Sequence, residues 1–167
     1  TGLPAGLFNV VTGKGSVVGN ALASSPKIDI VSVTGSVGAG ESIMKAAATN
    51  ITKVSIELGG KAPVIVFPDA DLELAAQAIL DSRIGNNGQI CNNAERLYIH
   101  KDVKEKLTAL LLEKFKAVKV GDPFSADDID MGPLVEKRAL ESVEEKVARA
   151  IEQGAKVLCG GHRVGEK

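Results

Sequence analysis

Cys91 stands in a setting that suits thiolate chemistry. Its neighbours in the stretch GQICNN, residues 88–93, are mostly polar amides and glycine, whereas a structural cysteine normally lies among apolar residues. A reactive cysteine must be accessible and close to polar or positive groups, because the thiolate is the nucleophile. Gly88 lets the backbone turn tightly before the cysteine. Hydrogen bonds could come from the nearby amides of Asn86, Asn87, Gln89, Asn92 and Asn93.

Neither histidine of the chain lies beside this cysteine in the sequence. His100 falls on the following predicted strand, and His162 lies close to the last residue. A papain-like mechanism, in which a histidine activates the thiol, is therefore poorly supported. The second cysteine, Cys159, follows Val157 and Leu158, and we interpret it as a packed structural residue.

Glu57 is a candidate general base. It lies at the end of an expected strand, residues 53–58, and two glycines follow at positions 59 and 60. Burial at a strand end disfavours the charged carboxylate, which raises its pKa and suits it to accept a proton. Taken alone, a solvent-facing glutamate at a strand end is the simpler interpretation.

A glycine-rich turn, TGSVGAGES at residues 34–42, is expected between a strand and a helix. Such a turn presents backbone N–H groups and the positive end of a helix dipole to a phosphate. Gly35, Gly40 and Ser42 have P-loop spacing, but Glu41 stands where the phosphate-binding lysine is required. The Rossmann order of glycines is also absent. This spacing leaves two interpretations open, a tight turn and a dinucleotide-binding turn.

The elements that position these residues follow from composition and periodicity. The 167 residues are 44% hydrophobic and 25% charged, with a net charge of −1. Near-neutral charge argues against a nucleic-acid partner, and no apolar run is long enough to cross a bilayer. Two dissimilar cysteines form no disulfide framework, so a cytoplasmic location is expected. Both ends fall inside incomplete patterns, which predicts a piece of a longer protein.

Strand-like runs alternate with helical patterns, which predicts an α/β fold with a parallel sheet. The expected strands are residues 7–11, 28–33, 53–58, 63–67, 96–100 and 155–159. Apolar residues with helical spacing predict helices around residues 72–80, 103–115 and 140–151. Asp102 is interpreted as the first residue of a capping box.

Gly59 and Gly60 predict a hinge between two lobes. A later acidic loop, residues 121–133, is expected to be a solvated connection. It lacks the ligand order of an EF-hand, so no metal site is predicted. Its acids are Asp122, Asp127, Asp128 and Asp130.

Three stretches, in this order, resemble the motifs of the aldehyde dehydrogenase superfamily. They are the turn at Thr34-Gly35-Ser36, the stretch ELGGK from Glu57 to Lys61, and the stretch GQIC that ends at Cys91. The opening GLPAGLFNVVTG and the stretch MGPL at residues 131–134 are also similar to that family. The resemblance implies a Rossmann-like parallel sheet of an NAD(P)-binding domain, residues 1–58. It also implies the start of an α/β catalytic domain, residues 59–167.

The resemblance implies the NAD(P)-dependent oxidation of an aldehyde to a carboxylic acid. Cys91 as thiolate would attack the aldehyde carbon to give a thiohemiacetal, whose hydride passes to NAD or NADP. Glu57 would activate the water that hydrolyses the resulting thioester, and the backbone N–H of Cys91 would help hold the oxyanion. The residues that match the family's cofactor contacts are Gly35, Ser36, Gly40 and Leu58.

Two departures from the family's usual pattern concern the substrate. Ile84 stands seven residues before the cysteine, where the family usually has an aromatic residue. Asn92 and Asn93 follow the cysteine, where small or apolar residues are common. This stretch is most similar to the lactaldehyde and glycolaldehyde dehydrogenase branch, and Asn92 would suit a substrate hydroxyl next to the aldehyde. Succinate-semialdehyde dehydrogenase is the nearest alternative.

Other functional classes compete with this interpretation. A non-catalytic nucleotide-binding or structural module would need neither Glu57 nor Cys91, and a CoA-acylating dehydrogenase typically lacks the water-activating glutamate. The resemblance places an oxyanion-hole asparagine and a ribose-binding lysine before this chain, and a second cofactor-binding glutamate after it. We therefore expect the isolated chain to be inactive. The expected partners are a small-molecule aldehyde and further copies of the protein in a dimer or tetramer, with no nucleic acid or membrane.

Overall fold

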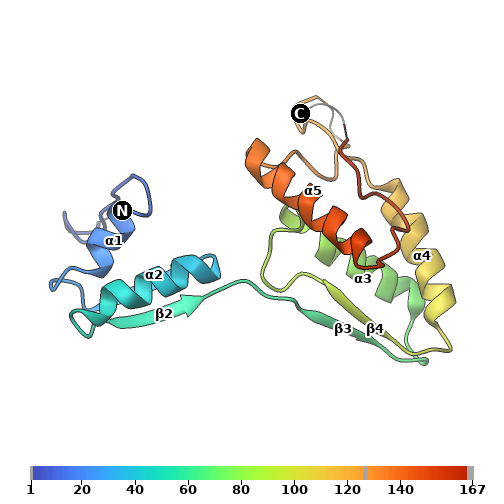
Figure 1. Cartoon of the computed structure of the whole chain (residues 1–167), viewed down its shortest axis with the longest axis horizontal. Helices are drawn as coiled ribbons and strands as arrows, with labels where there is room; N and C mark the ends of the chain where they lie inside the picture. The colour runs from blue at the N-terminus through green and yellow to red at the C-terminus, as the bar shows by residue number, and fades with distance from the viewer. Residues whose placement is uncertain (1, 126–127, 165–167) are drawn as a thin grey trace. The chain divides into compact units, whose positions relative to one another are not determined.

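The chain forms two compact units, Thr1–Gly59 and Gly60–Lys167. A computed structural model describes residues 2–125 and 128–164 (Figure 1). Each unit contains one two-stranded parallel sheet together with helices. Among the helices of these residues, none combines the length and the apolar character needed to span a bilayer.

The first unit is a single strand–helix–strand repeat preceded by a short helix. Its elements are α1 (Val18–Ala23), β1 (Ile30–Thr34), α2 (Val37–Ala48) and β2 (Lys53–Glu57). The two strands are parallel, with Ile30 opposite Lys53 and Thr34 opposite Glu57. Parallel neighbours need a crossover connection, and α2 supplies it. Figure 1 shows α2 running alongside β2.

The second unit repeats this plan with a larger helical layer. Its elements are β3 (Pro63–Val66), α3 (Leu72–Ile84), the 3₁₀ turn η1 (Gly85–Gly88), β4 (Arg96–Ile99), α4 (Lys104–Ala117) and α5 (Lys137–Glu152). Strands β3 and β4 are parallel, and α3 connects them. Asp71 caps α3, because its Oδ1 accepts the N–H of Leu74 at 3.1 Å. The cysteine-bearing segment is the connection from α3 to β4.

The core of the second unit lies between β3 and the facing sides of α3 and α4. It consists of Val66, Leu72, Ala76, Ile79, Ala94, Leu107 and Leu111. The apolar spacing in the sequence therefore marks the buried face of α3 correctly. Ala94, near the end of the cysteine-bearing segment, belongs to this core, so that end of the segment is anchored by apolar burial.

The α/β class and the middle four predicted strands are confirmed, but the first and last predicted strands are wrong. Residues 7–11 and 155–159 have no strand conformation. A β-branched run becomes a strand only when a neighbour pairs with it, and Val10 and Val11 are exposed. The Ala155 N–H donates instead to Ala150 O at 3.0 Å, which ends α5.

The predicted capping box at Asp102 is also wrong. Val103 occupies the N-cap position of α4, with φ −113° and ψ −1° and no side-chain cap. Asp102 lies one residue too early and pairs with His100, at 3.6 Å between Oδ2 and Nδ1. In the acidic loop, Asp128 pairs with Lys119, and Asp130 Oδ2 accepts the Lys119 N–H at 2.8 Å. Asp127 lies outside the described residues.

Candidate active site

The glycine-rich turn of the first unit is an exposed helix N-terminus. Ser36 is the N-cap of α2, and its Oγ accepts the N–H of Ala39 at 3.2 Å. The first turn of the helix is exposed and carries no acidic residue. A helix start leaves further N–H groups without intrahelical partners, and the helix dipole favours an anion there. This end of α2 therefore offers hydrogen-bond donors to a phosphate.

Gly40 allows α2 to lie close to β2. It is buried, and a Cβ at this position would come within 2.8 Å of Leu58 Cδ2 and 3.3 Å of Ile56 Cγ2. Packing therefore explains this glycine without a ligand. The exposed members of the predicted cofactor turn are Gly35 and Ser36.

Glu57 ends β2 beside this turn. Its carbonyl oxygen accepts the N–H of Gly35 at 3.0 Å, so the backbone of the predicted base is tied to the predicted phosphate turn. The side chain of Glu57 is exposed, and β2 is exposed along most of its length. The expected burial of this strand end is therefore wrong for the described residues, because β2 pairs only with β1 and α2 covers one face.

The cysteine loop, which we define as residues 85–95, follows α3. Three consecutive residues near its start have the left-handed conformation. They are Asn86 (φ 49°), Asn87 (φ 55°) and Gly88 (φ 74°). Asparagine and glycine tolerate this conformation better than other residues. The Nδ2 of Asn86 donates to Gln89 O at 3.2 Å, and the Nδ2 of Asn87 donates to Pro133 O at 3.1 Å. These two hydrogen bonds hold the part of the loop that precedes Cys91.

Cys91 and Asn92 form the exposed tip of the cysteine loop, whereas the next two residues are buried. Asn93 is 2% exposed and Ala94 is 6% exposed. The Ala94 N–H donates to Ser82 Oγ at 3.0 Å, which ties this limb to α3. The sequence named both amides as possible hydrogen-bonding groups near Cys91, but only Asn92 is accessible. The Nδ2 of Asn93 has no hydrogen-bond partner among the described residues.

The backbone of Gly60 lies directly against the backbone of Cys91. A Cβ built on Gly60 would stand 2.3 Å from the carbonyl oxygen of Cys91. Main-chain atoms cannot move aside as a flexible side chain does. The glycine therefore permits this close approach, which explains the second glycine of the ELGGK stretch.

Gly60→Ala should destabilise the second unit by about 1–3 kcal/mol, the usual cost of overpacking, and should displace Cys91. Urea unfolding measures the loss of stability, and the alkylation rate of Cys91 reports its displacement. Gly59→Ala is the matched control, because a Cβ there meets no atom within 4 Å. Equal stability and equal Cys91 alkylation in both variants would contradict the steric role of Gly60.

Cys159 is exposed, as Cys91 is. The interpretation of Cys159 as a packed residue is wrong, because residues 155–159 leave α5 as an irregular segment and not as a strand of a sheet. Accessibility therefore does not separate the two thiols. Their surroundings differ, because Cys91 lies on a loop held by hydrogen bonds both before and after the cysteine.

Glu95 carries the main electrostatic feature near Cys91. Its carboxylate pairs with Lys61 and, at 3.4 Å, with Arg83 Nη1. The hydrogen bond from Lys61 holds the pKa of Glu95 below its ordinary value, the charges of Lys61 and Arg83 lower it further, and desolvation acts in the opposite direction. Sequence analysis did not identify this cluster, because its members are far apart along the chain. Among residues 2–125 and 128–164 no group of three His, Cys, Asp or Glu side chains could hold a metal ion.

The comparison with known proteins agrees with this arrangement. The whole chain, residues 1–167, matches the family model described as "Aldehyde dehydrogenase family". The chain belongs to the aldehyde dehydrogenase family. The prediction made from the three sequence motifs is thereby confirmed.

Individual aldehyde dehydrogenases resemble the chain along nearly its whole length. It is 57% identical to lactaldehyde dehydrogenase from Escherichia coli (strain K12) over 163 residues, which cover 98% of this chain and 34% of that enzyme. It is 48% identical to 3,6-anhydro-alpha-L-galactose dehydrogenase from Vibrio sp. (strain EJY3) over 165 residues, which cover 99% of this chain and 34% of that enzyme. The chain thus spans about a third of the length of the curated relatives it matches.

Solved structures of aldehyde dehydrogenases share the fold. A crystal structure of lactaldehyde dehydrogenase from Escherichia coli matches with a TM-score of 0.96 and 57% identity, covering 99% of this chain and 35% of that one. A structure titled 3,6-anhydro-L-galactose dehydrogenase in complex with NAP matches with a TM-score of 0.93 and 47% identity, covering 99% of this chain and 35% of that one.

The predicted site residues of this aldehyde dehydrogenase chain fall into two sets. The first unit carries Gly35, Ser36, Gly40, Glu57 and Leu58, and there the backbone of the turn is bonded to the backbone of Glu57. The second unit carries Cys91 and Asn92 side by side at the tip of the cysteine loop. The exposed, acid-free start of α2 fits the pyrophosphate of a dinucleotide.

Proposed function

We propose that the chain is the central segment of an NAD(P)-dependent aldehyde dehydrogenase that oxidises a small hydroxyaldehyde, such as lactaldehyde or glycolaldehyde, to the carboxylic acid. The observation that carries this proposal is an exposed Cys91 on an anchored loop, in a chain 57% identical to a lactaldehyde dehydrogenase. We assign residues 1–58 to the cofactor-binding domain and residues 59–167 to the catalytic domain. The whole protein is a cytoplasmic homo-oligomer in this proposal.

Cys91 provides the nucleophile. Its thiolate adds to the aldehyde carbon, and the carbonyl oxygen becomes an oxyanion that the backbone N–H of Cys91 helps to stabilise. After oxidation the substrate remains on Cys91 as a thioester, and the thiolate is a good leaving group from it. Glu57 takes a proton from the water that attacks this thioester, which releases the acid and frees Cys91.

The first unit holds the cofactor in this proposal. Gly35 and Ser36 would hold the pyrophosphate at the start of α2, where Gly40 lets the helix lie close to β2. The backbone of Leu58, directly after Glu57, would help to hold the nicotinamide. NAD or NADP, when bound, accepts the hydride that leaves the substrate carbon.

The side chains beside Cys91 favour a hydroxyaldehyde over an acidic aldehyde. Ile90 and Asn92 flank the cysteine, and both are exposed and uncharged. An amide can hydrogen-bond a hydroxyl group next to the aldehyde, whereas a substrate carboxylate needs a cation. The second candidate substrate is nevertheless succinate semialdehyde, because the chain is 44% identical to succinate-semialdehyde dehydrogenase [NADP(+)] from Escherichia coli (strain K12).

The proposed function is tested by steady-state kinetics of a full-length enzyme that carries this chain. Reduction of NAD and of NADP is measured with lactaldehyde, glycolaldehyde, succinate semialdehyde and propanal. We expect the two hydroxyaldehydes to have the highest kcat/KM. A higher kcat/KM for succinate semialdehyde selects the second candidate, and the absence of cofactor reduction with every aldehyde overturns the proposal.

Asn92→Ala should reduce the preference for lactaldehyde over propanal by roughly three- to tenfold, because one hydrogen bond contributes about 0.5–1.5 kcal/mol. The ratio of the two kcat/KM values measures this preference directly. Asn50→Ala is the control, since this asparagine bonds Ser24 O in the first unit. An unchanged ratio in Asn92→Ala would remove Asn92 from the substrate pocket.

A further inference from the structure

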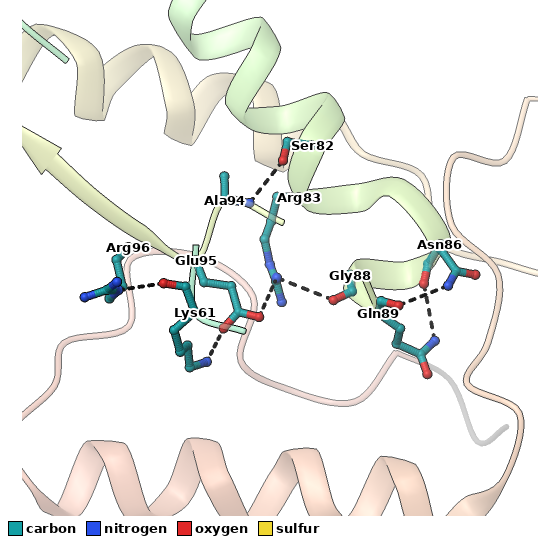
Figure 2. Close-up of polar contacts among 9 residues, drawn as sticks. All are labelled: Lys61, Ser82, Arg83, Asn86, Gly88, Gln89, Ala94, Glu95 and Arg96. Carbon is teal, nitrogen blue, oxygen red and sulfur yellow. Dashed lines mark hydrogen bonds and ion pairs between the residues drawn. The ribbon is translucent and has the colours of Figure 1, made fainter. Parts of the chain in front are cut away.

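The carboxylate of Glu95 joins two cations that reach it from different segments of the second unit. Lys61 follows Gly60 just before β3, and Arg83 lies in the last turn of α3. Glu95 itself lies four residues after Cys91, at the end of the cysteine loop. Figure 2 shows the Glu95 side chain with Lys61 on one side and Arg83 on the other.

Arg83 connects this carboxylate to the opposite limb of the cysteine loop. Its Nη1 donates to the carbonyl oxygen of Gly88 at 3.5 Å as well as facing Glu95. A Cβ built on Gly88 would lie 3.0 Å from Nη2, so the guanidinium also packs against the backbone there. One guanidinium therefore spans the limb before Cys91 and the limb after it.

Lys61 connects the same carboxylate to the backbone segment that contacts Cys91. The residue before it, Gly60, lies against the carbonyl oxygen of Cys91. The carbonyl oxygen of Lys61 accepts the Nε of Arg96 at 2.7 Å, and the N–H groups of Glu95 and Arg96 both donate to Ala62 O at 3.2 Å. Lys61 is thus held on both its side-chain and its main-chain atoms.

Glu95 is the least exposed of the three side chains. Its side chain is 18% exposed, whereas those of Arg83 and Lys61 are 38% and 74% exposed. An exposed ion pair contributes little to stability, but a carboxylate shared by two cations restricts the geometry of both. Glu95 is ionised at neutral pH. Because its pKa is lowered in the folded unit, its contribution to stability is lost as the pH falls from the ordinary glutamate range through the lowered pKa.

We propose that Glu95 is a positioning residue that, through Arg83 and Lys61, holds both limbs of the cysteine loop and so sets the position of Cys91. The proposal rests on the proposed function only in naming Cys91 as the reacting group. Glu95 acts through the loop backbone and takes no part in bond making or breaking.

The test is hydrogen exchange and kinetics of the full-length enzyme with Glu95→Gln, which keeps the shape of the side chain and removes its charge. Amide exchange in residues 85–94 should accelerate by roughly tenfold, while α5 stays unchanged. The kcat for aldehyde oxidation should fall roughly tenfold, with the KM for cofactor changed less than twofold. Lys61→Gln removes only the more exposed arm and should give a smaller change of the same kind.

Glu73→Gln is the control, because this glutamate in the first turn of α3 pairs with a lysine, Lys114, at 3.7 Å. It should change neither the exchange of the loop nor kcat. Unchanged loop exchange in Glu95→Gln overturns the positioning role, and so does acceleration throughout the unit. The exchange experiment does not depend on the chemistry of Cys91. An error in the proposed function would appear separately, as full aldehyde oxidation by the Cys91→Ala variant.

Discussion

Cys91→Ala should lower aldehyde oxidation by a full-length enzyme carrying this chain by roughly 10⁴-fold or more, as is typical when a covalent nucleophile is removed. The physical reason is that alanine offers no group that can add to the aldehyde carbon and leave again from the acyl product. Stopped-flow measurement of cofactor reduction should lack both the burst and the steady state. Cofactor binding should be retained, since the first unit is unchanged.

Cys159→Ala is the matched control, because this thiol is also exposed but lies on the irregular segment after α5. It should keep full activity. Mass spectrometry of the acid-quenched enzyme during turnover should find the acyl group on the peptide that contains Cys91. Activity of Cys91→Ala close to that of the unmodified enzyme, or an acyl group on Cys159, would falsify the assignment.

Glu57→Gln should slow steady-state turnover by roughly 10²–10⁴-fold, the usual contribution of a general base. The first turnover should be much less affected, because the base acts on water only after the substrate has been oxidised. Rapid mixing should therefore give a burst of reduced cofactor that approaches one per active site, followed by a slow phase. The acyl-enzyme on Cys91 should accumulate and be detectable by mass spectrometry.

Glu41→Gln provides the control for this variant, because Glu41 is an exposed carboxylate on α2 in the same unit. It should retain both the burst and the steady-state rate. If the burst of Glu57→Gln shrinks in proportion to its steady state, Glu57 acts before the thioester forms, and its assignment to hydrolysis fails.

Local patterns in the sequence predicted several elements correctly, although β1 and β4 contain no buried residue. The apolar spacing of α3 marks the face that packs in the core, and the β-branched runs mark β1, β3 and β4. The same kind of run failed at residues 7–11, because a strand also needs a partner and the sequence of the run carries no information about one. The cap of α4 failed for a similar reason, since Asp102 pairs with His100 instead.

Short motifs in the sequence were enough to name the candidate site residues, whose catalytic roles stay predictions. Cys91, Glu57 and Ser36 stand in short motifs, and the structure places Cys91 at an exposed loop tip and Ser36 at the N-cap of α2. The supports of the loop were not predictable, because they join distant segments. The close approach of Gly60 to Cys91 and the sharing of Glu95 exist only once the second unit has folded.

The bond from the Ala94 N–H to Ser82 Oγ closes the base of the cysteine loop. This bond fixes the backbone just before β4, so we expect a substitution at the loop tip to leave the register of β4 with β3 unchanged. Ile90 and Asn92, the exposed neighbours of Cys91, lie outside the apolar core, so substitutions there should cost less stability than substitutions at the buried Ala94. In the proposed enzyme, we therefore expect substitutions at these two positions to alter the aldehyde preference with the least change to the scaffold that carries Cys91.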